Sequence, residues 1–443
     1  MKQPEGPAKR ALRMAALTAG VTGSYVGYLA QRAFLGPEGR QRKLKAAHTR
    51  AAQRMTSEFL TLRGPAMKLG QTLSLQAGLL PEEMLRELAE LQMSAPGMHP
   101  TLARAQFKAS MGKAPEELFR SFTDEPFAAA SLGQVHHAVS RDGTRLAVKI
   151  QYPGIRAAVA NDFRWFRTVS RGAQLTRHLP ALSLAELEAQ ILAETDYGRE
   201  ADNLEHFRER LAPLPFVSVP RVYREYSGEG VLTMELLTGA HLDGFLAARP
   251  TQRIRDTLGA RLVELFYFQV LEVEAFHADP HWGNYLFGKD GTIGLVDFGC
   301  VKYLDSRFVQ TLRALYLYPG DRTGPGFQEQ LTRRHALYGQ KLTSAGRKAL
   351  ARFAENFYRT VYPPEVSRDD QPFDFAGDAF LKTYMRESAN LAKSKCALPE
   401  YLMMARAETG LYATLHRLRA RVPMSRIVRR HLGKGRPHRF PLA

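Results

Sequence analysis

The sequence predicts an α+β fold of two lobes, a small lobe on an antiparallel sheet and a larger helical lobe, preceded by a helical extension. Three observations lead to this fold. A turn signal at Asp142 and Gly143 has apolar alternation on both sides, which predicts a β-hairpin. Residues 183–211 begin with a capping-box signal and keep helical periodicity to their end. Two short apolar runs flank a tight turn between Gly288 and Gly291, which predicts a second hairpin.

The composition is that of a globular protein in a reducing compartment. The chain has 443 residues, which suggests two or three structural units at roughly 100–200 residues per domain. Hydrophobic residues make up 44% and charged residues 24%, which excludes wholesale disorder. Two cysteines, Cys300 and Cys396, leave no room for a disulfide framework or a Cys-ligated metal site.

The net charge of +18 is concentrated at the two ends of the chain. Residues 1–50 hold ten Lys and Arg against two Glu, and residues 401–443 hold ten against one. The body between them is nearly neutral, which weighs against a nucleic-acid groove. Basic ends on a neutral body favour anionic membrane lipids as partners, and no nucleic acid.

The N-terminal segment contains an uncharged stretch at residues 14–31 that is just long enough to span a bilayer. Ala, Gly, Thr and Ser dominate it, so a helix lying on the membrane surface is the alternative. Gly23 and Gly27 form a G-x-x-x-G step that would let two membrane helices approach, including those of two copies of the chain. We expect a membrane-associated protein on the cytoplasmic face of a bacterial inner membrane or its organellar equivalent.

The first hairpin carries a nucleotide-binding pattern. Protein kinases have G-x-G-x-x-G-x-V, followed by the lysine of V-A-I-K on the next strand. Aligning the valine with Val135 places Gly133 on the third glycine and alanines on the first two, and puts Lys149 on the lysine. We therefore expect nucleotide contacts from this hairpin, at Ala128, Ala130, Ser131, Gly133, Val135 and Lys149.

The helix over residues 183–211 supplies an acidic partner for that lysine. Its apolar side chains recur at three- and four-residue steps and share their face with Glu200. Asp196 lies one turn earlier on the same side, where like charges repel, so a cation must lie opposite. We predict a Lys149–Glu200 ion pair as in protein kinases, the alternative being a partly exposed Glu200.

A catalytic-loop pattern follows. Kinases have H-R-D-x-x-x-x-N and then D-F-G. Here Asp279 and Asn284 are separated by the same four residues, and Asp297 begins an Asp-Phe-Gly sequence. We predict Asp279 as a catalytic residue with Lys149 and Glu200, and Asn284 and Asp297 as ligands of Mg²⁺.

The remaining small-lobe elements and the loop aromatics have structural roles in this interpretation. Residues 220–224 and 230–237 are predicted to be the last two strands of the small lobe. Glu235 and Leu237 would then lie in the hinge that holds adenine. His281 and Trp282 are expected to shape the catalytic loop rather than to bind a metal.

Together these motifs resemble the UbiB (AarF-like) family of atypical protein-kinase-like proteins, over about residues 63–303. The family's K-x-G-Q motif is matched at Lys68–Gln71, and its E-x-D motif at Glu194–Asp196. The resemblance implies a two-lobed kinase-like fold in which a family-specific layer covers the active site, formed by Lys68, Gly70, Gln71, Glu194 and Asp196. Trp282 departs from the family, which usually has Pro there.

The resemblance also implies the cofactors and the pathway. ATP or ADP and Mg²⁺ are the expected cofactors, with ATPase-like or small-molecule phosphoryl transfer rather than phosphorylation of other proteins. The family is tied to ubiquinone and prenyl-lipid biosynthesis, so enzymes of quinone biosynthesis or prenyl-lipid intermediates are expected partners. A catalytically weak pseudokinase scaffold that binds nucleotide and lipid is the alternative. A nucleic-acid-binding protein is a further one, which no aromatic-interleaved basic patch supports.

The expected domain organisation follows from these motifs. It comprises a basic N-terminal segment (1–50), a helical extension with the K-x-G-Q motif (51–115), the small lobe (116–240), the helical lobe (241–400) and a basic C-terminal helix and tail (401–443).

Overall fold

The computed structural model describes residues 7–62, 83–84, 87, 98–130, 132–172, 184–279, 281–318, 324–336, 343–360, 371–394 and 399–432. They belong to two compact units, which are described in turn. The first unit comprises Met1–Ala201 and Val222–Leu236, and the second comprises Asp202–Arg221 and Leu237–Ala443. The fold is the predicted α+β one, with an antiparallel sheet in the first unit and a largely helical second unit.

The first unit combines the N-terminal helices with the antiparallel sheet. Its helices are α1 (Pro7–Gln31), α2 (Pro37–Leu62), α5 (Pro100–Met111), α6 (Pro115–Leu118), α7 (Ile155–Gly172) and α8 (Leu184–Ala193). Its strands are β1 (Ser121–Phe122), β2 (Ala128–Ala130), β3 (Gly133–Val139), β4 (Arg145–Gln151) and β6 (Val231–Glu235). Helix α9 (Tyr197–Arg210) begins in the first unit and ends in the second.

Strands β3 and β4 form the predicted hairpin at the centre of the sheet. The strand order is β1-β3-β4-β6, all antiparallel, and β2 also pairs with β3. Gly143 in the connecting turn has a φ of +93°, a backbone conformation that favours glycine. The Asp142 carboxylate accepts a hydrogen bond from the N–H of Thr144, which closes the turn. The hairpin prediction is confirmed.

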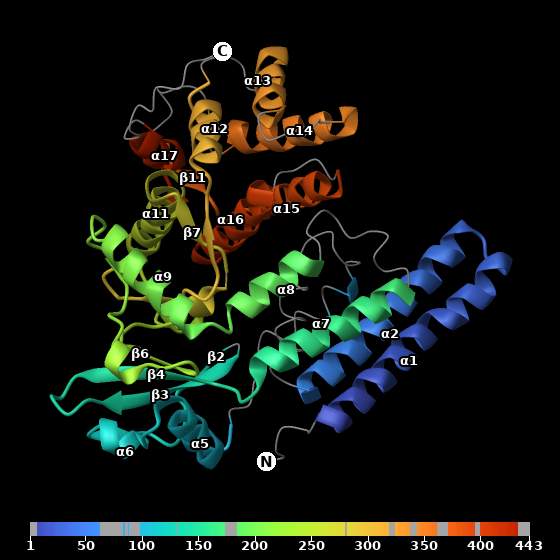
Figure 1. The fold of residues 1–443 in the computed structure, drawn as a ribbon. Coiled ribbons are helices and arrows are strands. Elements are labelled where there is room, and N and C mark those ends of the chain that lie inside the picture. Colours follow the sequence, from blue (N-terminus) through green and yellow to red (C-terminus); the bar gives the residue numbers. More distant parts are fainter. Residues whose placement is uncertain are drawn as a thin grey trace. The chain divides into compact units, whose positions relative to one another are not determined.

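One face of this sheet is packed on the apolar side of the unit. Successive side chains of a strand point to opposite faces, so Leu146, Val148 and Ile150 of β4 share one face. They are fully buried with Phe107 of α5 in one hydrophobic cluster, and Figure 1 shows α5 and α6 on this face. Lys149 therefore points to the opposite face of the sheet.

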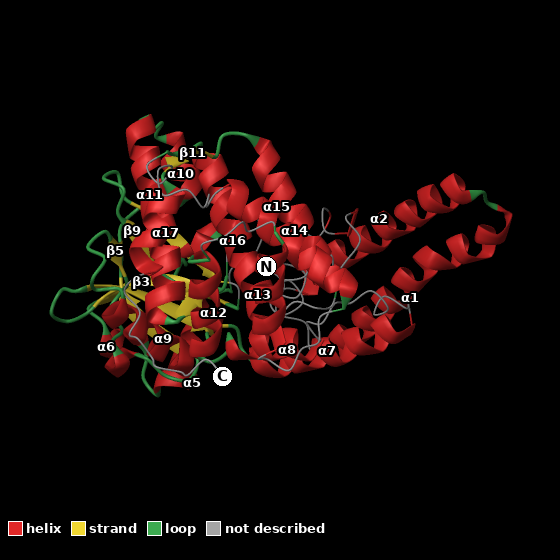
Figure 2. Ribbon diagram, turned by 90° about the horizontal axis from the view of Figure 1, so that it is seen from above, coloured by secondary structure: helices red, strands yellow, loops and turns green. Residues whose placement is uncertain are grey.

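Helices α1 and α2 form an antiparallel pair, side by side in Figures 1 and 2. Small residues allow the close approach: Gly20 and Gly23 of α1 face Arg54 of α2, whose guanidinium donates a hydrogen bond to the Gly20 carbonyl. Leu17 and Val21 are buried in this contact. Within the described ranges, no helix is long and apolar enough to cross a membrane.

The second unit is built mainly from helices. Its helices are α10 (Leu242–Ala247), α11 (Gln252–Phe268), α12 (Ser306–Tyr316), α13 (Pro325–Ala336), α14 (Ser344–Thr360), α15 (Asp378–Lys393), α16 (Pro399–Leu418) and α17 (Met424–Leu432). Its strands are β5 (Val217–Ser218), β7 (Ala275–His277), β8 (Tyr285–Phe287), β9 (Ile293–Leu295), β10 (Val301–Tyr303), β11 (Phe373–Asp374) and β12 (Arg421–Val422).

Short strand pairs position the loops of the second unit. Strands β8 and β9 are antiparallel and joined by the predicted turn, in which Gly291 has a φ of +80°. Strand β5 adds to β9 in parallel, and β7 pairs with β10 in antiparallel register. The loop between β7 and β8 and the loop between β9 and β10 therefore both begin and end on paired strands.

Two secondary-structure predictions were wrong in detail. The helix predicted over 183–211 is broken after Ala193, because Thr195 donates a hydrogen bond to the Leu192 carbonyl and Asp196 caps a new helix by accepting the N–H of Arg199. The strand predicted at 220–224 is reduced to an isolated bridge, followed by a 3₁₀ turn at Arg224–Tyr226.

The C-terminal region, predicted as a basic helix and tail, is largely helical where it is described and belongs to the second unit. Helix α16, strand β12 and helix α17 belong to the second unit, and α17 packs against α11. One face of α17 is buried through Met424, Ile427, Val428 and Leu432. The arginines of this region include three that pair with acidic side chains of the same unit, Arg417 with Asp243, Arg421 with Asp374 and Arg430 with Glu264. Residues 433–443 lie outside the described ranges.

Candidate active site

The first half of the predicted site residues is the ion pair between Lys149 of β4 and Glu200 of α9, both in the first unit. The ammonium lies 2.8 Å from each carboxylate oxygen, and the two side chains are only 8% and 1% exposed. The Tyr197 ring lies 5.1 Å from the same ammonium, so a cation–π contact adds to the pair. The prediction of a paired Glu200 is confirmed, and the alternative of a partly exposed Glu200 is wrong.

Helix α9 presents Glu200 to the lysine because its apolar face packs into the protein. Tyr197, Leu204 and Phe207 recur at three- and four-residue steps and are buried. Asp196 does not share this face, contrary to the prediction, because it caps the helix and is exposed. The burial of Glu200 is therefore offset by Lys149 and not weakened by a neighbouring carboxylate on the same helix.

The alanine-rich segment of the first unit forms strand β2, which pairs with β3 so that Ala128 lies opposite Val135 and Ala130 opposite Gly133. Gly133 is required by the packing of the sheet. A Cβ atom there would lie 2.3 Å from the carbonyl oxygen of Ile150 on the neighbouring strand, closer than non-bonded atoms approach. Ser131 lies outside the described residues. Thus the one glycine that matches the kinase pattern has a steric reason independent of any ligand.

The second half of the predicted site residues lies in the second unit and begins with the loop between β7 and β8. Asn284 donates a hydrogen bond from Nδ2 to Oδ2 of Asp279 at 3.2 Å, and the backbone N–H of His281 donates to Oδ1 at 3.4 Å. The N–H of Val296 donates to the Asn284 carbonyl at 3.1 Å, which ties this loop to the segment that precedes Asp297. The loop thus brings Asp279 and Asn284 together, as predicted.

The Asp297-Phe298-Gly299 segment is held by bonds to its backbone. The Asp297 carbonyl lies 2.6 Å from Nε2 of His277, and its carboxylate accepts the N–H of Gly299 at 3.0 Å. Phe298 is fully buried and packs on Phe207 of α9. These contacts therefore fix the position of the segment, in which Asp297 comes shortly after the end of β9.

Asn203 of α9 is a site residue that the sequence analysis missed. Its Nδ2 donates to the Phe298 carbonyl at 2.9 Å, and its Oδ1 accepts a hydrogen bond from the Tyr303 hydroxyl at 2.8 Å. Asn203 lies three residues after Glu200 on the buried face of α9. A polar residue on an apolar helix face needs a hydrogen-bond partner, and this pattern could have indicated its role. Asn203 therefore supports the loop that carries Asp297.

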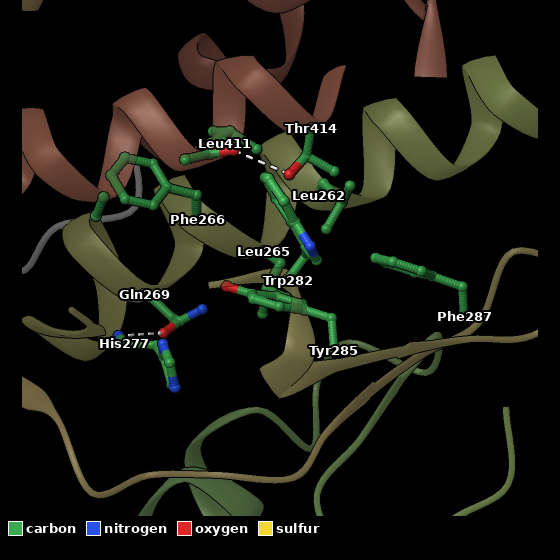
Figure 3. Close-up of a pocket in the computed structure, with 12 residues that line it drawn as sticks. Leu262, Leu265, Phe266, Gln269, His277, Trp282, Tyr285, Phe287, Leu411 and Thr414 are labelled. Atoms are coloured by element: carbon green, nitrogen blue, oxygen red, sulfur yellow. Dashed lines mark hydrogen bonds between the residues drawn. The ribbon is translucent and has the colours of Figure 1, made fainter. Parts of the chain in front are cut away.

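Trp282 anchors the catalytic loop, in keeping with the structural role predicted for it. Figure 3 shows its ring beside Leu262 and Leu265 of α11 and near Thr414 of α16. The cavity that these residues line has a volume of about 30 Å³, and the guanidinium of Arg417 lies 4.9 Å from the Trp282 ring. The large ring fills space that a proline would leave open.

Two neighbours complete the surroundings of the loop. His281 accepts the N–H of Gly283 through Nδ1 and so begins the 3₁₀ turn of the loop. Burial raises the pKa of the Tyr285 phenol, and the negative charge of Asp279 raises it further. Tyr285 thus remains a neutral phenol beside the Asp279 carboxylate.

The metal-binding atoms predicted for this half have the chemistry that Mg²⁺ prefers. Asp297 offers carboxylate oxygens and Asn284 an amide oxygen, since its Nδ2 already donates to Asp279. No cluster of three or more His, Cys, Asp or Glu side chains that could enclose a metal by themselves occurs in the described part of the chain. Two ligands suit a magnesium ion that shares its remaining positions with phosphate oxygens and water.

Some of the other predicted site residues lie within the described ranges, and some do not. Glu235 ends β6, and the chain passes from the first unit to the second between Leu236 and Leu237, within the predicted hinge. Glu194 is buried between α8 and α9, and Asp196 is exposed. The other three residues of the covering layer, Lys68, Gly70 and Gln71, lie outside the described residues.

Comparison with known proteins identifies the family. The model of the ABC1 atypical kinase-like domain matches residues 90–322, which is more than half of the chain. The chain belongs to the ABC1 atypical kinase-like family. This family includes the UbiB proteins that the motifs resemble.

Individual relatives agree with this assignment. "Protein ACTIVITY OF BC1 COMPLEX KINASE 7, chloroplastic" of Arabidopsis thaliana is 31% identical over 71% of this chain and 46% of its own length. "Atypical kinase COQ8, mitochondrial" of Saccharomyces cerevisiae is 28% identical over 84% of this chain and 74% of its own. The chain spans less than half of the first of these relatives.

A solved structure supports the fold. The structure of Rv3197 with erythromycin, from Mycobacterium tuberculosis, superposes with a TM-score of 0.57 and 25% sequence identity. The match covers 83% of this chain and 91% of that chain. The fold shared with that structure therefore extends beyond residues 90–322, which the domain model matches.

Proposed function

We propose that this chain is an ATP-binding atypical kinase or ATPase of the UbiB type, which acts at a membrane surface and supports ubiquinone or related prenyl-lipid biosynthesis. The observation that carries the proposal is the buried Lys149–Glu200 pair, because protein kinases use the same pair to hold the nucleotide phosphates. Relatives named atypical kinases support the same activity.

The described residues supply the parts of a phosphoryl-transfer site. In this proposal Lys149 contacts the α- and β-phosphates and is oriented by Glu200, while Asp297 and Asn284 hold Mg²⁺. The metal would neutralise phosphate charge when bound. Asp279 orients or deprotonates the acceptor, water included. Catalysis then consists of positioning and charge stabilisation, with no covalent intermediate on the protein.

The acceptor is proposed to be water or a small molecule and not another protein. Ala128 and Ala130 stand where kinases have glycines, and each adds a methyl group where a backbone would approach phosphate. Slow turnover is the expected consequence.

Turnover of Mg²⁺-ATP by the full chain tests the proposal directly. Asp297→Asn should abolish hydrolysis, because it removes the charged metal ligand. Asp290→Asn is the matched control, since Asp290 lies in the exposed turn between β8 and β9, where its carboxylate accepts hydrogen bonds from Thr292. Nucleotide-dependent thermal shifts with and without Mg²⁺ should report binding in parallel. Equal rates in the wild type and Asp297→Asn would reject the enzyme and favour the scaffold alternative.

The membrane part of the proposal is supported by the tip of the α1–α2 hairpin. Phe34 is 90% exposed there, and Val26 and Leu29 are also exposed. Arg42 and Lys43 lie exposed on the first turns of α2 beyond the tip. An aromatic side chain beside basic ones suits an anionic lipid surface, where each cation near the membrane contributes about 1 kcal/mol.

Vesicle flotation tests this surface. Wild-type protein should float with vesicles that contain anionic lipid, less at high salt, and weakly with neutral phosphatidylcholine. Phe34→Ser and the double variant Arg42→Gln/Lys43→Gln should both reduce flotation. Leu12→Ser is the control, because Leu12 is 72% exposed near the other end of α1. Equal losses in Phe34→Ser and Leu12→Ser would reject the tip as the lipid contact.

A further inference from the structure

Helix α16 places a buried arginine beside the catalytic loop of its own unit. Nη2 of Arg406 lies 3.9 Å from Oδ1 of Asp279, and the two side chains are 9% and 16% exposed. The local sequence around Asp279 does not indicate this pairing, because Arg406 lies far along the chain on α16. Arg406 also lies outside residues 90–322, which the family model matches.

The burial of this guanidinium calls for a compensating charge. Its Nε and Nη1 atoms are buried without a hydrogen-bond partner in the structure. A buried cation with open donors is costly unless an anion lies close by. Within the described residues, the acidic group recorded within ion-pair distance of Arg406 is Asp279. The guanidinium is therefore retained for its charge, since packing alone would favour an apolar side chain of similar length.

The loop itself provides no cation next to Asp279. In the kinase pattern H-R-D an arginine precedes the aspartate, whereas here that position is Ala278, which is fully buried. The positive charge of the kinase arginine is therefore supplied here by Arg406 of α16, which lies outside the loop.

The contacts of the Asp279 carboxylate show what Arg406 adds. Oδ2 accepts a hydrogen bond from Asn284, and Oδ1 accepts one from the backbone N–H of His281. Tyr285 lies close enough for the charge of Asp279 to raise its pKa. Neither Asn284 nor the His281 amide brings a positive charge, so Arg406 is the cation among these groups.

We propose that Arg406 is a positioning residue for Asp279, which holds the carboxylate in place toward the phosphoryl acceptor. The inference rests on the proposed function and extends it by making α16 part of the catalytic half-site of the second unit. Arg406 acts on the acceptor side of the reaction, because Lys149, Asn284 and Asp297 are the residues assigned to nucleotide and metal.

The first test compares turnover and nucleotide affinity in Arg406→Met, Arg406→Ala and the control Arg333→Met. Arg333 is a surface arginine of the same unit, in an exposed pair with Glu329. Arg406→Met should lower kcat by about 100-fold, as expected for a misplaced catalytic group, with the nucleotide Kd within about twofold of the wild type.

Chemical rescue separates positioning from a structural role. Millimolar guanidinium ion should restore part of the activity of Arg406→Ala and none to Asp279→Asn/Arg406→Ala. A kcat for Arg406→Met equal to that of Arg333→Met would overturn the inference. Parallel losses of kcat and nucleotide affinity would overturn it as well.

The second test does not depend on turnover. Urea unfolding midpoints are measured for Asp279→Asn, Arg406→Met and the double variant. Each single change should lower the midpoint by leaving a buried charge unpaired, and the double variant should lie above both. Additive shifts would overturn the inference, whatever the turnover. Absence of ATP turnover in the wild type with non-additive shifts would reject the proposed function and retain the ion pair.

Discussion

Removal of one partner of the Lys149–Glu200 pair should destabilise the protein far more than removal of both. Lys149→Met leaves the Glu200 carboxylate, which is 1% exposed, without its ammonium. Glu200→Gln leaves the ammonium, which is 8% exposed, facing a neutral amide. Breaking a buried pair from one side costs about 3–5 kcal/mol, because the remaining charge has lost its water and its partner.

The double variant Lys149→Met/Glu200→Gln leaves no charge at this position. Replacement of a buried pair by uncharged side chains of similar size is often near neutral, so we expect the double variant to recover most of the loss of either single change. A loss of 3–5 kcal/mol corresponds to a fall in Tm of about 6–20 °C for a unit of this size, at 2–4 °C per kcal/mol. Tm and urea midpoints of the four proteins are the measurements.

The pH dependence of the unfolding free energy provides a second test of the same substitutions. In Lys149→Met the stranded carboxylate should take up a proton as the pH falls, so its penalty relative to the double variant should shrink between about pH 8 and pH 5. Nucleotide turnover should stay lost in all three variants, because each lacks the lysine or its orienting partner. Additive losses in the double variant, or a penalty that grows as the pH falls, would refute the reasoning.

Three further predictions concern other parts of the structure. Gly133→Ala should lower the free energy of unfolding by about 1–3 kcal/mol, since its Cβ would collide with the Ile150 carbonyl, whereas Gly36→Ala, with no atom within 4 Å of its Cβ, should change the urea midpoint little. Asn203→Ala should remove the support of the Phe298 carbonyl and lower ATP turnover more than nucleotide affinity, and equal losses in both would contradict that role. Glu408 is fully buried, and burial raises its pKa to about 7, so its protonated form stabilises the fold below the unfolded pKa of about 4.3, and that contribution is lost as the pH rises through 7. Relative to Glu408→Gln, the wild type should lose about 3 kcal/mol between pH 4 and pH 8, and a flat difference in unfolding free energy would contradict this.

Local patterns predicted the parts of the site whose spacing is fixed by one element or one turn. The β3–β4 hairpin and the Asp279–Asn284 contact follow from motifs within short segments. The Lys149–Glu200 pair joins residues 51 positions apart and was predicted from the order of the kinase motifs. The break between α8 and α9 was missed because the apolar periodicity continues through it, while the capping by Asp196 depends on a single backbone hydrogen bond.

Contacts between distant segments could not be predicted in this way. Arg406 looks in the sequence like one more basic residue of a charged C-terminal region, and its burial beside Asp279 depends on how α16 packs. The packing of α17 against α11 was likewise not predicted, because attention fell on the basic side chains of this end. The apolar residues of α17 recur at helical spacing, and this signal was outweighed by the charge.

The division of the chain into units has a practical consequence for how the protein can be dissected. The polypeptide passes between the two units three times, after Ala201, after Arg221 and after Leu236. A fragment that ended at Ala201 would lack β6, and the Lys149 strand would become an open sheet edge with unpaired backbone groups, which promotes aggregation. A protease that cut at one passage would leave two covalent connections intact. We therefore expect the two units to be expressed and degraded together and not as separate fragments.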